Sequence, residues 1–235
     1  MSAERILCAI DTADLGAALD LAEALAGRIG GLKIGKQLFT AHGPEAVARI
    51  TGAGHQVFLD LKFHDIPATV AAAVAAAAAL GCFVLTVHAS GGPEMLRAAA
   101  RATAAIANPP LVVGVTVLTS LNDGDLDTVG QSGPVPRQVL RLAELARECG
   151  LGGVVCSPHE ITALRGALGG DFKLIVPGVR PDWAGADDQK RIMTPAEAVA
   201  VGADYLVIGR PITRAADPAE AAGRIADEIA AGAGR

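Results

Sequence analysis

The sequence predicts an α/β fold in which eight parallel strands alternate with helices and close into a barrel. Short runs of aliphatic residues recur along the chain, with amphipathic or alanine-rich segments between them, as expected for parallel strands joined by helices. These runs are almost continuously apolar, which is typical of strands covered on both faces. The length of 235 residues is close to the roughly 250 residues of a typical (β/α)8, or TIM, barrel.

The strand candidates follow one another along the whole chain. In order they are residues 6–10, residues 32–35, a third run that begins at Val57, and residues 83–88, 111–118, 153–156, 172–176 and 205–208. No linker rich in Pro or Ser interrupts the series. We therefore expect a single domain over residues 1–235.

The segments between these runs have helical patterns. Residues 14–27 place leucine and alanine side chains on one face, and Asp14 is a typical N-cap. Further helices are expected at residues 44–51, 67–80, 93–106 and 137–149, after Ser157-Pro158, and at residues 218–231. Residues 122–133 repeat aspartate at every second position but lack the glycine and glutamate of an EF-hand loop, so we expect a solvated loop there.

The amino-acid composition indicates an aliphatic core and argues against a nucleic-acid-binding protein. Hydrophobic residues make up 51% of the chain and aromatic residues only 3%, so Ala, Val, Leu and Ile must form the core. The net charge is −5 and no run of Lys or Arg occurs, which argues against nucleic-acid binding. The four cysteines, Cys8, Cys82, Cys149 and Cys156, are far apart. We expect buried, reduced thiols and a cytoplasmic location.

The sequence does not predict a membrane protein. Residues 1–5 carry no apolar signal-peptide region. Residues 66–87 have no formal charge and are as long as a membrane span. Most of the first half of this segment is alanine, which is only weakly hydrophobic, and Leu80-Gly81 predicts the end of a helix. We therefore expect a buried helix followed by a buried strand.

The third strand candidate carries the most distinctive charges. Asp60 and Lys62 are two residues apart, so both side chains point to one face of a strand. Asp65 follows where the strand ends, and the flanking residues 57–59 and Ile66 are expected to be buried. Two flanking carboxylates keep Lys62 protonated, which suits a proton donor better than an amine nucleophile. An exposed strand end with solvated charges is the alternative.

Polar residues also lie in or at the ends of most of the other strand candidates. They are Asp11, Lys33, His88, Thr119, Arg180 and Arg210. The carboxyl ends of barrel strands meet at one rim, where the active site lies, so we expect these side chains to converge with the charges of the third strand. We expect His88 instead to be packed and hydrogen-bonded in a structural turn.

Two glycine–arginine turns indicate a phosphate site. Gly178 and Arg180 follow the seventh strand candidate, and Gly209 and Arg210 follow the eighth. In these barrels the loops after strands seven and eight are the usual phosphate site. The polar segment 180–191, which holds Gln189, is long enough for a lid.

Signals for a metal or a nucleotide cofactor are absent from the sequence. No His, Cys, Asp or Glu cluster has metal-ligand spacing. No G-x-G-x-x-G follows a strand candidate. We therefore expect neither a metal nor a cofactor.

Several segments together resemble the orotidine 5′-phosphate decarboxylase family. They are Asp11, residues 32–36 (Leu-Lys-Ile-Gly-Lys), residues 60–67 (Asp-Leu-Lys-Phe-His-Asp-Ile-Pro), residues 177–181 (Pro-Gly-Val-Arg-Pro) and residues 208–211 (Ile-Gly-Arg-Pro). The resemblance covers nearly the whole chain. It implies a homodimer that converts orotidine 5′-monophosphate to UMP and CO2, the last step of de novo pyrimidine nucleotide biosynthesis, without metal or cofactor.

The resemblance also implies residue roles. The catalytic charged network corresponds to Lys33, Asp60, Lys62 and Asp65. The substrate-binding set corresponds to Asp11, Lys33, Asp60, Thr69, Thr119, Arg180, Gln189, Gly209 and Arg210. Within this set, Asp11 and Thr69 hold ribose hydroxyls, Thr119 contacts the pyrimidine, and the last four residues, from Arg180 on, bind the phosphate. Asp65 and Thr69 act in the partner subunit's site.

Three alternatives remain open. A magnesium-dependent sugar-phosphate relative, such as 3-keto-gulonate-phosphate decarboxylase or hexulose-phosphate synthase, shares the D-x-K-x-x-D strand but has an acidic metal ligand where this chain has Lys33. A Schiff-base aldolase needs a neutral lysine, against which Asp60 and Asp65 argue. An inactive barrel that only binds a phosphorylated ligand is the third alternative.

Overall fold

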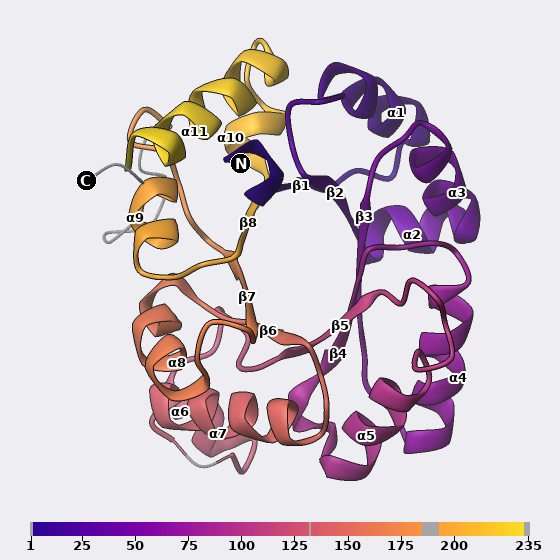
Figure 1. Cartoon of the computed structure of the whole chain (residues 1–235), viewed down its shortest axis with the longest axis vertical. Helices are drawn as coiled ribbons and strands as arrows, with labels where there is room; N and C mark the ends of the chain where they lie inside the picture. The colour runs from indigo at the N-terminus through magenta and orange to yellow at the C-terminus, as the bar shows by residue number, and fades with distance from the viewer. Residues whose placement is uncertain (1, 132, 185–192, 233–235) are drawn as a thin grey trace.

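Eight parallel strands form a closed barrel in which each strand pairs with its neighbours in sequence and β8 pairs with β1. The structure is a computed structural model that describes residues 2–131, 133–184 and 193–232. The strands are β1 (Ile6–Ile10), β2 (Gly31–Gly35), β3 (Val57–Phe63), β4 (Val84–His88), β5 (Leu111–Val115), β6 (Gly153–Val155), β7 (Lys173–Pro177) and β8 (Tyr205–Ile208). The predicted (β/α)8 architecture is confirmed (Figure 1).

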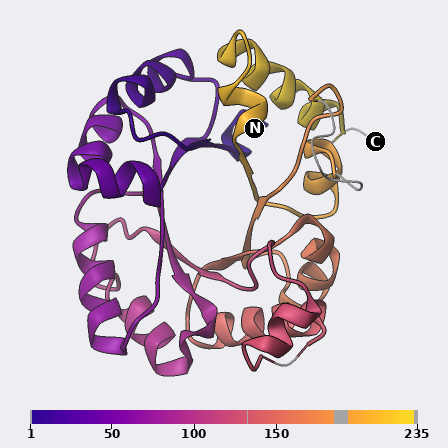
Figure 2. The same ribbon diagram turned by 180° about the vertical axis from the view of Figure 1, so that it is seen from behind.

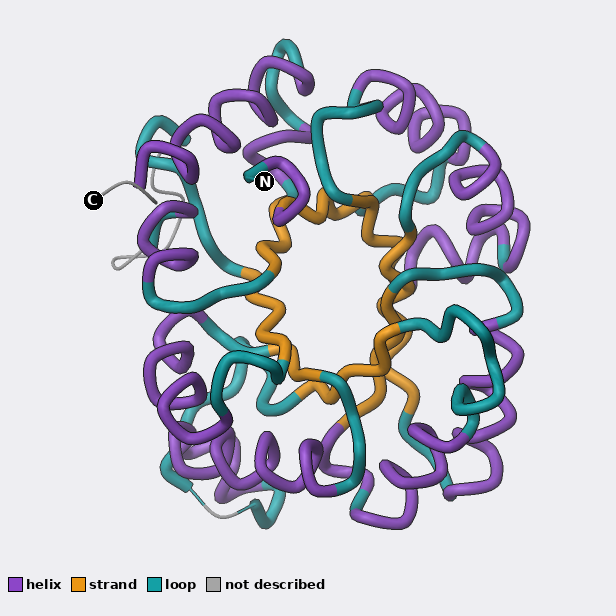
Figure 3. Tube along the Cα trace, in the orientation of Figure 1, coloured by secondary structure: helices purple, strands orange, loops and turns teal. Residues whose placement is uncertain are grey.

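Helices surround the ring of strands, as both ends of the molecule show (Figures 1 and 2). They are α1 (Leu15–Ala24), α2 (Lys36–His42), α3 (Pro44–Gly52), α4 (Pro67–Ala78), α5 (Pro93–Arg101), α6 (Asp123–Thr128), α7 (Val135–Glu148), α8 (Ile161–Leu168), α9 (Pro195–Ala200), α10 (Arg210–Thr213) and α11 (Pro218–Gly232). The tube view separates the inner ring of strands from this outer layer (Figure 3). Asp14 caps α1 as predicted, because its side chain accepts a hydrogen bond from the Ala17 N–H.

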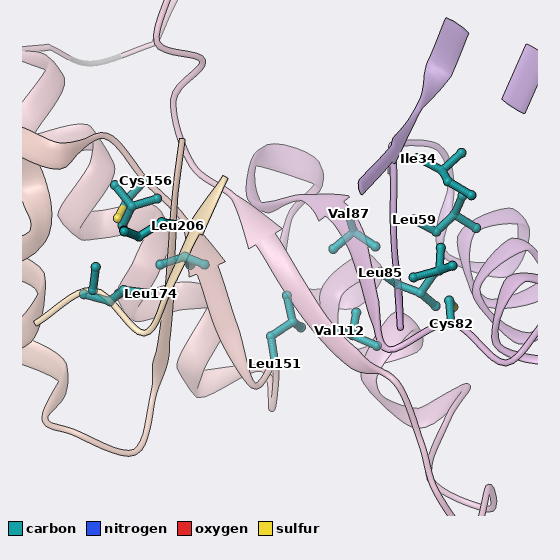
Figure 4. Packing of buried hydrophobic residues seen from close by; sticks show 14 of the residues in the cluster. Ile34, Leu59, Cys82, Leu85, Val87, Val112, Leu151, Cys156, Leu174 and Leu206 are labelled. Carbon is teal, nitrogen blue, oxygen red and sulfur yellow. The ribbon is translucent and has the colours of Figure 1, made fainter. Parts of the chain in front are cut away.

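The strands are apolar on both faces because each face packs in a different part of the core. In β1, Leu7 and Ala9 point into the barrel, and Ile6, Cys8 and Ile10 point to the helices. Figure 4 shows buried side chains that point from the strands to the helices, among them Ile34 of β2, Leu59 of β3 and Leu85 of β4, which belong to an outer core cluster. All four cysteines are buried and unpaired, as expected. The inward-pointing side chains form an inner core cluster that closes the barrel below its carboxyl-terminal rim. Its buried members are Leu7, Ala9, Phe58, Val84, Val113, Ile175 and Val207.

Several local expectations are wrong. Residues 123–128 are helical where a solvated loop was expected, because Asn122 and Asp125 form a capping box and acidic side chains lie at the start of the helix. The short helices α2, α9 and α10 were not predicted. Strand β5 ends at Val115, three residues before the expected end at residue 118.

Strand β3 is irregular at its functional end. Its pairing with β4 matches Leu59 with Leu85 and Phe63 with Val87, so the register shifts between these pairs. Lys62 has φ 55°, the only positive φ of a non-glycine residue in the described part of the chain. The shift is a β-bulge of the kind that re-aims side chains beside active sites. The side chains nevertheless keep the predicted alternation, because Leu61 and Phe63 pack against the core under the helices and Asp60 and Lys62 point to the opposite face, where they form an ion pair.

Candidate active site

A cavity of about 400 Å³ opens at the carboxyl-terminal ends of the strands. Eight of the predicted site residues line it: Asp11, Lys33, Asp60, Lys62, Thr119, Arg180, Gly209 and Arg210. Ala9, Phe58 and Val207 of the inner core also line this cavity. The predicted convergence of polar residues at one rim is confirmed for the seven polar residues among these eight, which lie in or after six different strands.

The charged residues of the cavity alternate in sign. The Lys62 Nζ lies 2.6 Å from Asp60 Oδ2, and the Lys33 Nζ lies 3.8 Å from the same oxygen and 3.5 Å from Asp11 Oδ1. The side chains of Lys33 and Asp60 are only 12% and 11% exposed. Because each partly buried charge has a partner of opposite sign, the network offsets the cost of removing these groups from water.

Asp65 lies outside this network within its own chain. Its Oδ1 accepts a hydrogen bond of 2.6 Å from the Ile66 N–H, and Asp65 is exposed. The expected pairing of Lys62 between Asp60 and Asp65 is therefore wrong within one chain, where Asp60 instead lies between Lys62 and Lys33. Thr69 is exposed on the first turn of α4. Ile66, expected to be buried, is 66% exposed, because it lies in the turn that leads out from the barrel rim.

Thr86 is a site residue that the sequence reasoning missed. It lies in β4 and is fully buried. Its hydroxyl donates a hydrogen bond of 3.0 Å to Asp60 Oδ1 and accepts one of 2.8 Å from the Lys62 N–H. The available signal was a hydroxyl in an otherwise apolar strand, Val-Leu-Thr-Val.

The glycine–arginine turns lie together on the β7 and β8 side of the cavity. Gly178, Arg180, Gly209 and Arg210 all line it. Gly178 has φ 83°, a conformation that glycine adopts at no steric cost. The Arg180 N–H donates a hydrogen bond of 3.1 Å to the Met193 carbonyl, so the first residue of the predicted lid segment 180–191 is joined to a residue just beyond its end. Gln189 lies outside the described residues.

His88 lies beside the charged network at the end of β4. Its ring centroid is 5.4 Å from that of His64, with the planes tilted by 42°. Burial lowers the pKa of His88, and the nearby His64, Lys36 and Lys62 lower it further, whereas Asp60 opposes them. The expected packing of the imidazole is confirmed. The expected hydrogen bond of the imidazole is not formed with any of the described residues.

Thiol chemistry is unsuited to this site. Cys156 lines the cavity, yet burial raises its pKa far above the ordinary value, so the thiol stays protonated. Burial also raises the pKa of Cys8 to about 12. Both thiols are therefore inert packing groups.

The described residues contain neither a candidate metal-ligand cluster nor a candidate membrane span. Among residues 2–131, 133–184 and 193–232, no three His, Cys, Asp or Glu side chains are grouped so that they could hold a metal ion. Within the same ranges, no helix combines the length and the apolar character needed to cross a bilayer.

Comparisons with known proteins agree on one family. The family model described as "Orotidine 5'-phosphate decarboxylase / HUMPS family" matches residues 4–225. The orotidine 5′-phosphate decarboxylase of Paramagnetospirillum magneticum is 54% identical over 229 residues, covering 95% of this chain and 97% of that protein. The enzyme of the same name from Trichlorobacter lovleyi is 52% identical and covers 97% of this chain and 96% of its own.

Solved structures have the same fold. The crystal structure of orotidine 5′-phosphate decarboxylase from Lactobacillus acidophilus aligns with a TM-score of 0.85 at 35% identity, over 95% of this chain and 98% of that chain. The enzyme from Pyrococcus horikoshii aligns with a TM-score of 0.78 at 26% identity, over 96% and 99% of the two chains. Because the sequence matches extend over nearly the whole chain and the cavity unites the predicted residues, the chain belongs to the orotidine 5′-phosphate decarboxylase / HUMPS family.

Proposed function

We propose that the chain converts orotidine 5′-monophosphate to UMP and CO2 without a metal or a cofactor, as the last step of pyrimidine nucleotide synthesis. Membership of the family supports the reaction. The observation that carries the proposal is the Lys33–Asp60–Lys62 network, which shares one cavity with Arg180 and Arg210. A cavity with an ammonium network and separate arginines suits a substrate that carries both a reacting carboxylate and a phosphate.

Lys62 is the proposed proton donor. Loss of CO2 leaves a carbanion at C6 of the pyrimidine, and the ring does not delocalise this charge. Enzymes lower barriers by roughly 8–23 kcal/mol, and this reaction needs the upper end of that range. A preorganised ammonium aimed at C6 stabilises the developing charge and then protonates the carbon. Asp60, placed near the departing carboxylate, would destabilise the bound substrate by repulsion.

The remaining cavity residues are proposed to bind the substrate. Asp11 holds the ribose together with Thr69 of the partner subunit, Lys33 belongs to the charged network, and Thr119 contacts the pyrimidine. Gly209 and Arg210 bind the phosphate together with Arg180 and with Gln189 of the segment between the two loop ends. Because the phosphate is remote from the reacting carbon, its binding energy can drive closure of the site and so contribute to turnover.

We also propose that the active form is a homodimer. Asp65, Ile66 and Thr69 are exposed together at the start of α4. A large aliphatic side chain beside an acid and a hydroxyl suits a two-fold interface, in which the same surface of each copy meets the other. In this arrangement, Asp65 and Thr69 complete the partner's site. The buried, unpaired thiols support a reducing compartment such as the cytoplasm.

A UMP-formation assay in excess EDTA tests the proposed reaction. An ammonium at Lys33, 3.5 Å from Asp11 and 3.8 Å from Asp60, would repel Mg²⁺ from the nearest carboxylates. We expect equal activity in EDTA and in Mg²⁺. Activity that is lost in EDTA and restored by Mg²⁺ would favour the sugar-phosphate relatives, and UMP binding without turnover would favour the inactive barrel.

A further inference from the structure

We propose that Thr86 is a positioning residue that sets the geometry of both Asp60 and Lys62. Its hydroxyl forms a hydrogen bond with the Asp60 carboxylate and another with the backbone N–H of Lys62. The inference rests on the proposed function, because it assigns Thr86 a part in aiming the Lys62 ammonium.

Thr86 points into the barrel toward the charged network. Along β4, Val84 belongs to the inner core cluster and the side chains of Leu85 and Val87 to the outer one. The alternation of a strand therefore turns Thr86 inward, on the same side as Val84. Its side chain is fully buried, so water does not compete for its hydroxyl.

The bulge in β3 lies directly opposite Thr86. Leu59 pairs with Leu85 and Phe63 with Val87, so Asp60, Leu61 and Lys62 lie across from the single residue Thr86. Lys62 takes φ 55° within this segment, a conformation that is unfavourable for a residue with a side chain. The hydrogen bond from the Lys62 N–H to the Thr86 hydroxyl ties the bulge to β4 at this point.

The two hydrogen bonds also orient the Asp60 carboxylate. A hydroxyl has one proton to donate, and Thr86 directs it at Asp60 Oδ1 while its oxygen receives the Lys62 N–H. With Oδ1 held in this way, Oδ2 is turned toward both ammonium groups, 2.6 Å from Lys62 and 3.8 Å from Lys33. Loss of the hydroxyl frees the carboxylate to rotate and removes one restraint on the Lys62 backbone.

The test is Thr86→Val, which replaces the hydroxyl with a methyl group of similar size. Since misplacement of a reacting group by about 1 Å can cost on the order of 100-fold, we expect kcat to fall roughly 10- to 100-fold. The Kd for UMP should stay within about threefold, because the phosphate contacts are untouched. Thr86→Ser restores the hydroxyl and is expected to return kcat to within about threefold of wild type.

Thr116→Val is the matched control. Thr116 is also buried, and its hydroxyl donates a hydrogen bond of 3.0 Å to the Val155 carbonyl. The change removes a buried hydroxyl from the same barrel without touching a charged residue, so the melting temperature is expected to fall while kcat stays at the wild-type value.

The outcomes separate the inference from the proposed function. Wild-type protein that forms no UMP would refute the proposed reaction itself. If wild type is active and Thr86→Val keeps kcat within about threefold, or loses kcat only as much as Thr116→Val does, Thr86 has a structural role alone. Should Thr86→Val not fold, Thr86→Ala is measured against Thr86→Ser with the same expected loss, and equal kcat values for these two would overturn the inference.

Discussion

At the scale of single residues, the site depends on compensation between opposite charges. Asp60 lies between two ammonium groups, and Lys33 in turn lies between two carboxylates. Each of these charges would be costly to bury alone, so removal of one partner leaves the other uncompensated. The network therefore places two ammonium groups and two carboxylates next to one another in a single cavity.

Arg210 provides a test of the phosphate assignment. Arg210→Ala should weaken UMP binding by about 1.5–3 kcal/mol, because it removes a charge-assisted contact. Calorimetry of UMP binding measures this change. Arg49→Ala removes the same charge from the exposed face of α3, where Arg49 pairs with Glu45, and should leave the affinity within about twofold. Turnover of orotidine, which lacks the phosphate, should not respond to Arg210→Ala. Equal losses with both substrates would place Arg210 away from the phosphate.

His88 should make stability depend on pH. Burial and the positive groups around it lower its pKa below the ordinary 6.5, so the unfolded chain takes up this proton first as the pH falls. The folded state therefore loses stability from pH 6.5 down to the lowered folded pKa. Urea denaturation between about pH 7 and about pH 5 should show a smaller loss for His88→Gln than for wild type. His159→Gln, at an exposed position, is the control. The same pH dependence in His88→Gln and wild type would contradict this expectation.

At the scale of elements, the sequence predicts regular structure well and irregular structure poorly. The eight strands are short apolar runs whose period and length are local properties, and all eight are present. Helix α6 depends on a capping box between Asn122 and Asp125, which stabilises a six-residue helix in a polar segment. The bulge at Lys62 depends on pairing with β4, a partner distant in sequence. Local patterns do not contain that information.

The turn between β3 and α4 is the element for which we propose a role in the partner subunit. Asp65 is exposed there, away from its own cavity. We expect a mixture of inactive Asp65→Ala and inactive Lys62→Ala protomers to regain activity on subunit exchange. A heterodimer would then contain one site with both defects and one intact site, which gives about half of the wild-type activity per heterodimer. Asp65→Ala mixed with itself is the control. Proven exchange without recovery would place both residues in the same subunit's site.

At the scale of the whole molecule, closure of the barrel is what assembles the site. Asp11 follows β1 and Arg210 follows β8, and these ends of the chain meet because β8 pairs with β1. The general barrel rule therefore predicted the location of eight site residues from strand order alone. It did not predict Thr86, which is buried below the rim, nor the separation of Asp65 from the network of its own chain.

The most direct measurement is single-turnover UMP formation by Lys62→Ala. We expect this variant to lose nearly all turnover but to keep its fold and much of its UMP affinity, since the phosphate and ribose contacts remain. Small alkylammonium ions should restore part of the activity, less effectively than the tethered group. Lys173→Ala, which removes a lysine paired with Asp204 at the start of β7, should retain full activity. If Lys62→Ala kept turnover within about tenfold of wild type, a loss of only ~1.4 kcal/mol, Lys62 would not be the proton donor and Lys33 would be the next candidate.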